Sequence, residues 1–182
     1  NCNGVHKPTL KPAKKVTDTF SLKADFDIVQ GGSGYLATWT GTPEQATVIE
    51  YARINGGGAL DGAIRVIPNQ VAATPQVTFS PTSNRYAIAY AVGSFGKLDF
   101  VKADGSLEPA STIDLAEYCP IRSLSWVSNT FFVPTNYACA SSSRSWRAIS
   151  EAGGLTQTTM STYATRSAIA GGGRLNVLLQ DQ

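Results

Sequence analysis

The sequence has little charge, a single histidine and no long apolar run. Asp, Glu, Lys and Arg make up 15% of the 182 residues, against about 25% in an average soluble protein. Because His6 is the only histidine, a Ser-His-Asp triad would depend on a residue close to the first position. No stretch approaches the roughly 18 consecutive apolar residues that a membrane-spanning helix needs. We therefore expect neither a histidine-based hydrolase nor a membrane span.

Metal, cofactor and nucleic-acid sites are not expected either. The three cysteines form no CxxC pair, and no segment has the dense Asp and Asn of a calcium loop. The net charge of +2 is too small for a surface that binds polyanions throughout. In the segment HKPTLKPAKK the lysines alternate with prolines, a pattern that favours a protected edge strand over an anionic contact.

Turn residues and β-formers are abundant. The chain contains 17 Gly and 9 Pro, and its 7 Tyr and 7 Phe outnumber its 3 Trp. This composition favours short strands and many turns over helices. The length suits one domain with a sizeable core.

Four leucines mark an internal period. They lie 50, 47 and 48 residues apart, at Leu10, Leu60, Leu107 and Leu155. The last three follow glycine turns in the segments RINGGGAL, VKADGSL and AISEAGGL, which are strong hairpin signals. An Ile or Val lies six residues before each of these leucines, at Ile54, Val101 and Ile149. Each leucine is expected to open the outer strand of its unit.

A second hairpin recurs in every unit. Its copies are FDIVQ-GGSG-YLATWT, PQVTFS-PTSN-RYAIAYAV, RSLSWV-SN-TFFVPTNYAC and RSAIA-GGG-RLNVLLQ. Four strands in about fifty residues are typical of a β-propeller blade. We therefore predict an all-β, propeller-like array of about four antiparallel four-stranded blades, forming one domain over residues 1–182.

The predicted units are residues 20–70, 71–120 and 121–163, and residues 164–182 and 5–19 would form a composite fourth blade. That last blade is either closed by the N-terminal strand or left incomplete, in which case another chain would supply the missing strand. An open or composite blade predicts a protein partner or self-association.

The segment PQVTFSPTSNRYAIAYAVGSFGKLDFVKADGSLEPASTI, residues 75–113, resembles the propeller-type blade repeats of large secreted bacterial proteins. The resemblance covers nearly the whole chain, although residues 121–163 depart from it with Cys139, Trp146 and SEAGG in place of Ala-Asp-Gly. It implies extracellular or cell-surface display and binding, and it supplies no catalytic residues. In a secreted protein the leader would be gone, and Asn1 would be a mature end.

Cys119 and Cys139 are predicted to form a disulfide. A two-residue turn at Ser128 and Asn129 pairs positions whose numbers add to 257, and the two cysteines miss this register by one residue. A bulge or a three-residue turn absorbs that difference. Two buried thiols are the alternative, which an oxidising compartment disfavours. Cys2 would be free, linked to another chain or paired outside this sequence.

Charged side chains are predicted to meet near the axis of the array. The first strand of a propeller blade lies at the axis, and it carries Asp25 and Asp27 in the first unit and Arg122 in the third. A neutralised, solvated tunnel is the favoured interpretation. A glycosidase that uses the paired carboxylates is the alternative.

Trp146, followed by Arg147, is the aromatic that we expect at the surface, where it would bind a ligand such as a glycan. Trp39 and Trp126 lie within apolar strands and are expected in the core. The sequence therefore predicts a secreted, non-catalytic binding or scaffold domain that self-assembles through its open or composite blade. The alternative is a glycan-binding lectin or a glycoside hydrolase that acts at one mouth of the propeller.

Overall fold

The computed structural model describes residues 25–41, 47–68, 72–117, 121, 123–136, 144–160, 164–171 and 174–180. Several predictions of the sequence lie outside these ranges. They concern the N-terminal strand at 5–19, Arg122 and the three cysteines, so the disulfide between Cys119 and Cys139 stays a prediction.

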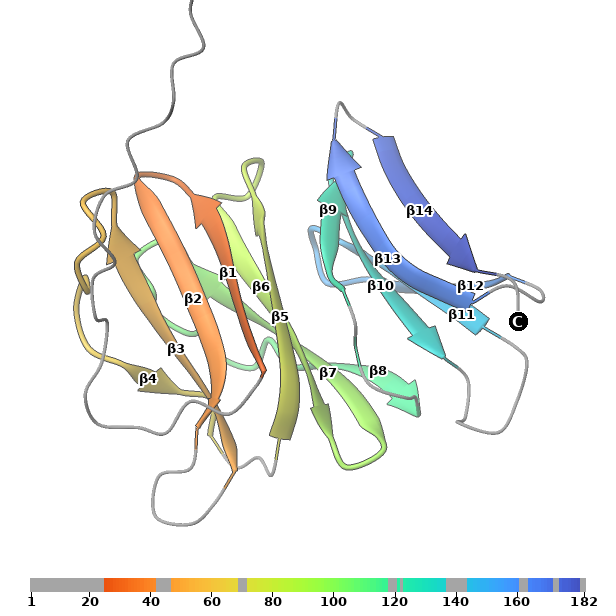
Figure 1. Ribbon diagram of the computed structural model, residues 1–182, viewed down its shortest axis with the longest axis horizontal. Coiled ribbons are helices and arrows are strands. Elements are labelled where there is room, and N and C mark those ends of the chain that lie inside the picture. The colour runs from red at the N-terminus through yellow and green to blue at the C-terminus, as the bar shows by residue number, and fades with distance from the viewer. Residues whose placement is uncertain are drawn as a thin grey trace, which may run out of the picture.

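The protein is all-β over the described residues, as predicted, and its strands form four consecutive antiparallel sheets (Figure 1). The first sheet contains β1 (Phe26–Gly31), β2 (Gly34–Gly41), β3 (Val48–Asn55) and β4 (Arg65–Val66). The second contains β5 (Ala72–Ser80), β6 (Arg85–Val92), β7 (Phe95–Lys102) and β8 (Ile113–Glu117). The third contains β9 (Ser125–Val127), β10 (Thr130–Asn136), β11 (Arg144–Ser150) and β12 (Leu155–Met160). The fourth contains β13 (Ala164–Gly171) and β14 (Arg174–Gln180).

The glycine turns form the predicted hairpins. Across these turns, Ile54 pairs with Leu60, Val101 pairs with Leu107, and Ile149 pairs with Leu155. Within the turns, backbone φ is 78°, 85° and 83° at Gly58, Gly105 and Gly153. Glycine adopts this left-handed conformation without the steric cost of a Cβ atom, which is why the sequence marks the turns so clearly.

The turn at Ser128 and Asn129 also has the predicted register. Thr130 pairs with Val127, and Phe131 pairs with Trp126. Both turn residues have positive φ, 49° and 63°, as a type I′ hairpin requires.

The outer strands of the first two sheets are shorter than the sequence predicts. β4 contains only Arg65 and Val66, because the chain after Leu60 turns away at Gly62, where φ is 96°. β8 begins only at Ile113, after Pro109, which has no N–H to donate, and Ala110, which has a φ of 52°. In the third sheet no such break follows the leucine, and β12 starts directly at Leu155.

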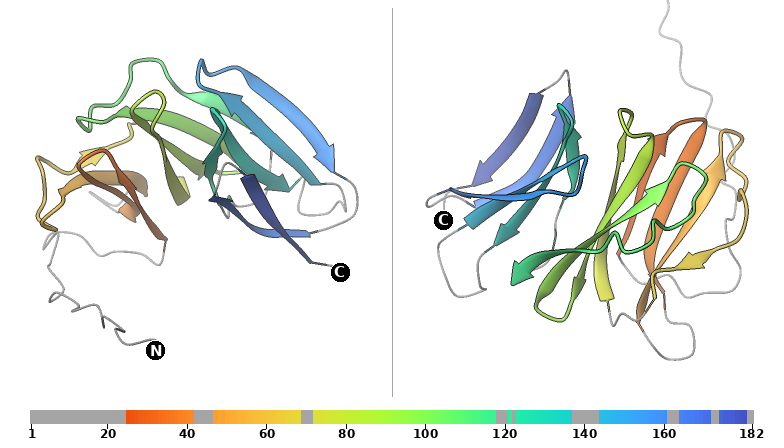
Figure 2. Two further views of the ribbon diagram at one scale, coloured as in Figure 1. Left: turned by 90° about the horizontal axis from the view of Figure 1, so that it is seen from above. Right: turned by 180° about the vertical axis from the view of Figure 1, so that it is seen from behind.

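The sheets follow one another along an open arc, with the first and fourth sheets at opposite ends (Figures 1 and 2). Three sheets have four strands and the fourth has two, so the described residues form three complete four-stranded sheets, an incomplete fourth sheet and no closed ring. The strand predicted to widen the fourth sheet lies in residues 5–19, outside the described ranges. No helix in the described part of the chain is long and apolar enough to cross a bilayer.

Apolar side chains fill the spaces between the sheets. One buried cluster joins the first and second sheets, and includes Leu36, Tyr51, Val77 and Ile88. A second joins the second and third sheets, and includes Phe100, Phe131 and Ile149. Since burial of apolar area is the main stabilising term in folding, these two clusters hold the neighbouring sheets together and fix the position of the turns at their edge.

Candidate functional site

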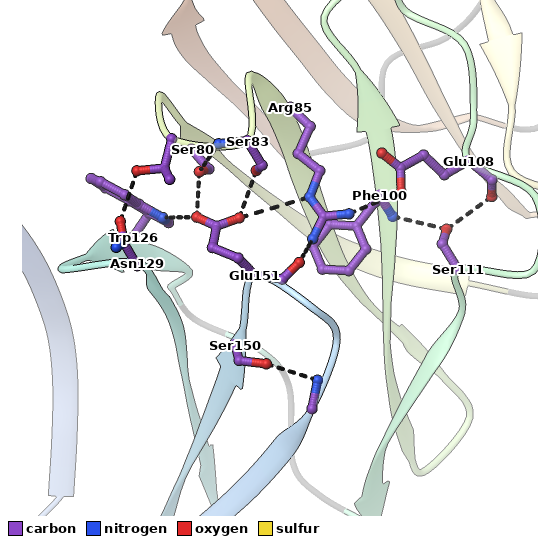
Figure 3. Close-up of polar contacts among 12 residues, drawn as sticks. Ser80, Ser83, Arg85, Phe100, Glu108, Ser111, Trp126, Asn129, Ser150 and Glu151 are labelled. Carbon is purple, nitrogen blue, oxygen red and sulfur yellow. Dashed lines mark hydrogen bonds and ion pairs between the residues drawn. The ribbon is translucent and has the colours of Figure 1, made fainter.

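Glu151 lies at the centre of a polar junction between the second and third sheets (Figure 3). Its carboxylate accepts hydrogen bonds from the hydroxyls of Ser80 and Ser83, the latter at 2.6 Å, and from the indole nitrogen of Trp126 at 2.6 Å. Three donors from two sheets therefore converge on one side chain. We call Glu151, Ser80, Ser83, Trp126 and Arg85 the Glu151 junction.

Arg85 completes this junction from the start of β6. Its Nη1 lies 2.9 Å from a carboxylate oxygen of Glu108, and its Nη2 donates to the backbone oxygen of Glu151. The guanidinium carbon lies 3.6 Å from the centroid of the Phe100 ring, a cation–π contact. Arg85 is thus held by an acid, a carbonyl and an aromatic face at once.

Two hairpin turns bring these groups together. In the turn after β5, the Ser80 hydroxyl accepts a hydrogen bond from the Ser83 nitrogen at 3.2 Å, and Asn84 has a φ of 51°. In the turn after β11, the Ser150 hydroxyl accepts one from the Gly154 nitrogen at 3.0 Å. Such local side-chain bonds to the backbone are characteristic of tight turns, and here they present Arg85 and Glu151 on the same edge of the arc.

Two clefts lie beside Arg85 and Glu108, which line both. One has a volume of about 400 Å³ and is also lined by Phe100, Ser111, Thr112 and Glu151. The other has a volume of about 470 Å³ and is also lined by Ser83, Asn84, Lys102 and Asp104. Both clefts therefore offer hydrogen-bond donors and acceptors with charges of both signs.

The charges around these clefts are stabilised in their ionised forms. Burial acts to raise the pKa of Glu151, but the hydrogen bonds from Ser80, Ser83 and Trp126 and the charge of Arg85 together lower it. The pKa of Asp104 is also lowered, first by its hydrogen bonds with Ser106. Both carboxylates are therefore ionised at neutral pH, which suits a surface that recognises polar groups.

Asp25 and Asp27, the predicted axial acids, contact the neighbouring sheet. The carboxylate of Asp27 accepts a hydrogen bond from the Val77 nitrogen of β5 at 2.8 Å and one from the Ile28 nitrogen at 2.9 Å. Asp25 lies 3.4 Å from the Thr74 nitrogen. Burial raises the pKa of Asp27, and the two backbone hydrogen bonds only partly oppose this. Both acids therefore bind main-chain donors of β5, Thr74 within its β-bulge and Val77 just after it.

The other predicted site residues are placed as follows. Arg147 is buried, 5% exposed, and its Nε donates to the backbone oxygen of Leu115 at 3.0 Å. Trp39 is buried in the core, as predicted, with 3% exposed. Trp126 packs against the cluster that joins the second and third sheets, and its indole nitrogen donates a hydrogen bond to Glu151. The side chain of Trp146 and all of Arg122 lie outside the described part of the structure.

Arg85, Glu108 and Glu151 were not among the site residues predicted from the sequence. One signal was present in the sequence. The turn before Leu155 has SEAGG where the turn before Leu107 has Ala-Asp-Gly, and this difference places Glu151 at the start of the turn. The Glu151 partners Ser80 and Ser83 lie about seventy residues earlier in the chain and Trp126 lies 25 residues earlier, so only the packing of the sheets reveals them.

Comparisons with known proteins add no assignment. No family model matches the chain, and no curated protein matches it. Within the described ranges, no three side chains of His, Cys, Asp or Glu come together as metal ligands would.

Proposed function

We propose that this chain is a secreted, non-catalytic binding or scaffold module of the β-propeller type. One observation carries the proposal: the first strands of successive sheets lie against one another, β5 against β1, β9 against β5 and β13 against β9 (Figure 1). Consecutive up-and-down sheets that stack through their first strands have the plan of propeller blades. In this interpretation the open arc is part of a ring, and its hairpin turns form one mouth.

The turn edge supports a binding role for this module. Both clefts open there, and the groups that line them are already held by contacts within the protein, such as the ion pair of Arg85 with Glu108. A surface that is ordered before it meets its ligand loses less conformational entropy on binding. The ligand would be a neutral or zwitterionic molecule, or a protein segment, with several hydrogen-bonding groups.

An array experiment tests the binding role. The full chain would be applied to immobilised glycans and peptides, together with the variants Glu108→Gln and Asp114→Asn. Glu108 lines both clefts, whereas the Asp114 side chain is 78% exposed and lies outside them. We expect binding that Glu108→Gln reduces roughly tenfold and Asp114→Asn leaves unchanged. Absence of binding, or equal binding by both variants, would contradict the proposal.

Glycan recognition at the same edge is the second candidate, in the form of either a lectin or a glycoside hydrolase. The polar lining and the volumes of the two clefts favour it. The two forms are separated by turnover of aryl glycosides. A hydrolase that acts at these clefts would lose activity on Glu108→Gln, whereas a lectin would show no turnover in any variant.

A further inference from the structure

The outer face of the first sheet, which is turned away from the second sheet, is unusually apolar. Cross-strand register places paired residues on one face, and Phe26 pairs with Trp39 while Ile28 pairs with Ala37. Of the six large apolar side chains that are exposed among the described residues, four belong to this face: Phe26, Ile28, Leu60 and Val66.

Ile28 occupies the same position in the first sheet as Val77 in the second. In each sheet the residue that bridges across the glycine turn pairs with a tyrosine of the second strand, and these pairs are Ile54–Tyr35 and Val101–Tyr86. Ile28 and Val77 each pair with the residue two places beyond that tyrosine. The two faces are therefore built on the same plan.

The two positions differ sharply in exposure. Val77 is 4% exposed because it packs in the cluster that joins its sheet to the preceding one, whereas Ile28 is 43% exposed. The third sheet behaves like the second. Leu124 lies two residues before Trp126, just as Val77 lies two residues before Phe79 in the second sheet. Leu124 is 8% exposed and packs against the second sheet. This face is thus covered by a preceding sheet wherever the described chain provides one.

The exposed part of the face lies where such a sheet would make contact. The centre is already buried, since Trp39 is 3% and Ala52 1% exposed, with Tyr35 and Ile64 packed against their cluster. Exposure is concentrated on β1, at Phe26 and Ile28, and on the outer segment at Leu60 and Val66. In the junction of the first and second sheets, the first strand of the later sheet, β5, is the strand that lies against the earlier sheet. By the same geometry, β1 is the strand that a preceding sheet would meet.

We propose that the outer face of the first sheet docks against the fourth sheet of a second copy of this chain. In the second and third sheets, the corresponding face is covered by the preceding sheet of the same chain. The fourth sheet ends the arc, with no described sheet beyond it, and it lies far from the first sheet of its own chain (Figure 2). Two copies related by a twofold axis would therefore each cover the other, which closes the association. This inference rests on the propeller-type arrangement proposed above.

Sedimentation of the full chain over about 1–100 μM tests the docking. We expect a reversible dimer, whose dissociation constant rises at least roughly tenfold in Phe26→Glu, because a charge enters an apolar contact. Phe26 is 59% exposed, so the substitution leaves the monomer folded, which circular dichroism verifies. Phe95→Glu is the matched control, because Phe95 is 50% exposed but lies on β7 of the second sheet. The dissociation constant of the dimer should be the same in this variant as in the wild type.

Other results overturn the docking. A monomer at all concentrations does so, and so does a dimer that Phe26→Glu leaves intact. A dimer that is lost on deletion of residues 1–18 but kept in Phe26→Glu would assign the contact to that segment instead. The array experiment with Glu108→Gln is independent of these outcomes. A monomer that binds through the clefts would therefore refute the docking alone.

Discussion

The carboxylate of Asp27 accepts a hydrogen bond at 2.8 Å from the backbone nitrogen of Val77, a residue of the next sheet. A side chain of one sheet thus satisfies the main chain of its neighbour at the β5 edge, where no further strand of the described chain pairs with β5. Edge strands with free N–H groups invite unwanted pairing. Asp27 therefore both joins two sheets and protects the edge of the second.

Asp27→Ala is expected to destabilise the fold, and Asp27→Asn much less. Removal of the carboxylate leaves the partly buried Val77 nitrogen without its acceptor, at a cost of about 1–2 kcal/mol. Asparagine keeps an acceptor oxygen and removes a charge whose burial raises the pKa of Asp27. Urea unfolding at neutral pH measures both variants. An equal loss in both would show that the charge, and not the hydrogen bond, joins the sheets.

Arg85 and Glu108 are expected to be energetically coupled. Their ion pair of 2.9 Å has partners with side-chain exposures of only 13% and 23%, so solvent screens it less than an exposed pair. A double-mutant cycle with Arg85→Ala and Glu108→Gln should give a coupling of about 1 kcal/mol. Lys97 and Asp114 provide the control cycle, because Asp114 is 78% exposed, and there the coupling should be within about 0.5 kcal/mol of zero. Equal couplings would refute the role given to burial.

The sequence predicted hairpins and registers that depend on local chemistry. Glycine at positive φ marks the turns before Leu60 and Leu107, and a two-residue turn at Ser128 and Asn129 sets the pairing of β9 with β10. These features involve neighbours along the chain, so composition and spacing suffice to predict them.

The Glu151 junction could not be predicted in the same way. It joins Glu151 to Ser80 and Ser83, about seventy residues earlier, and these contacts exist only once the second and third sheets are packed. Trp126 shows the limit most clearly. Its apolar strand correctly predicted contact with the core, but the hydrogen bond of its indole nitrogen depends on a turn of another hairpin.

Glu151→Gln is expected to destabilise the protein most at neutral pH, by about 2 kcal/mol. In the folded protein, burial acts to raise the pKa of Glu151, but hydrogen bonds and Arg85 lower it below the ordinary value of 4.5. A carboxyl with a lowered folded pKa stabilises the fold above its unfolded pKa, and this contribution is lost as pH falls through the folded value. Urea unfolding of wild type and variant should therefore differ at neutral pH and converge in acid.

Glu50 is a matched control of opposite sign. Burial raises its pKa above the ordinary value of 4.5, and the hydrogen bond from Trp39 opposes this only in part. Its ionisation therefore reduces stability as pH rises through the folded pKa. Glu50→Gln should gain stability relative to wild type over that interval, as measured by the same urea titrations. A change in the same direction for both variants would contradict the assigned causes.

Gly31→Ala is expected to weaken the junction of the first and second sheets. A Cβ atom at Gly31 would lie 2.4 Å from the Phe79 ring and 2.6 Å from the Tyr86 ring, and the Tyr86 hydroxyl also donates to the Gly31 oxygen at 2.8 Å. Because these rings pack together with centroids 4.9 Å apart, they cannot both move aside, and overpacking costs about 1–3 kcal/mol.

Gly56→Ala is the control for this substitution, since its Cβ would meet only the Ser33 oxygen, at 3.3 Å, in an exposed turn. Thermal unfolding should show a clear fall in the melting temperature for Gly31→Ala and little change for Gly56→Ala. If both variants melted together, close packing between the first two sheets would not limit stability. The first sheet would then be held mainly by hydrogen bonds such as that of Asp27 with Val77.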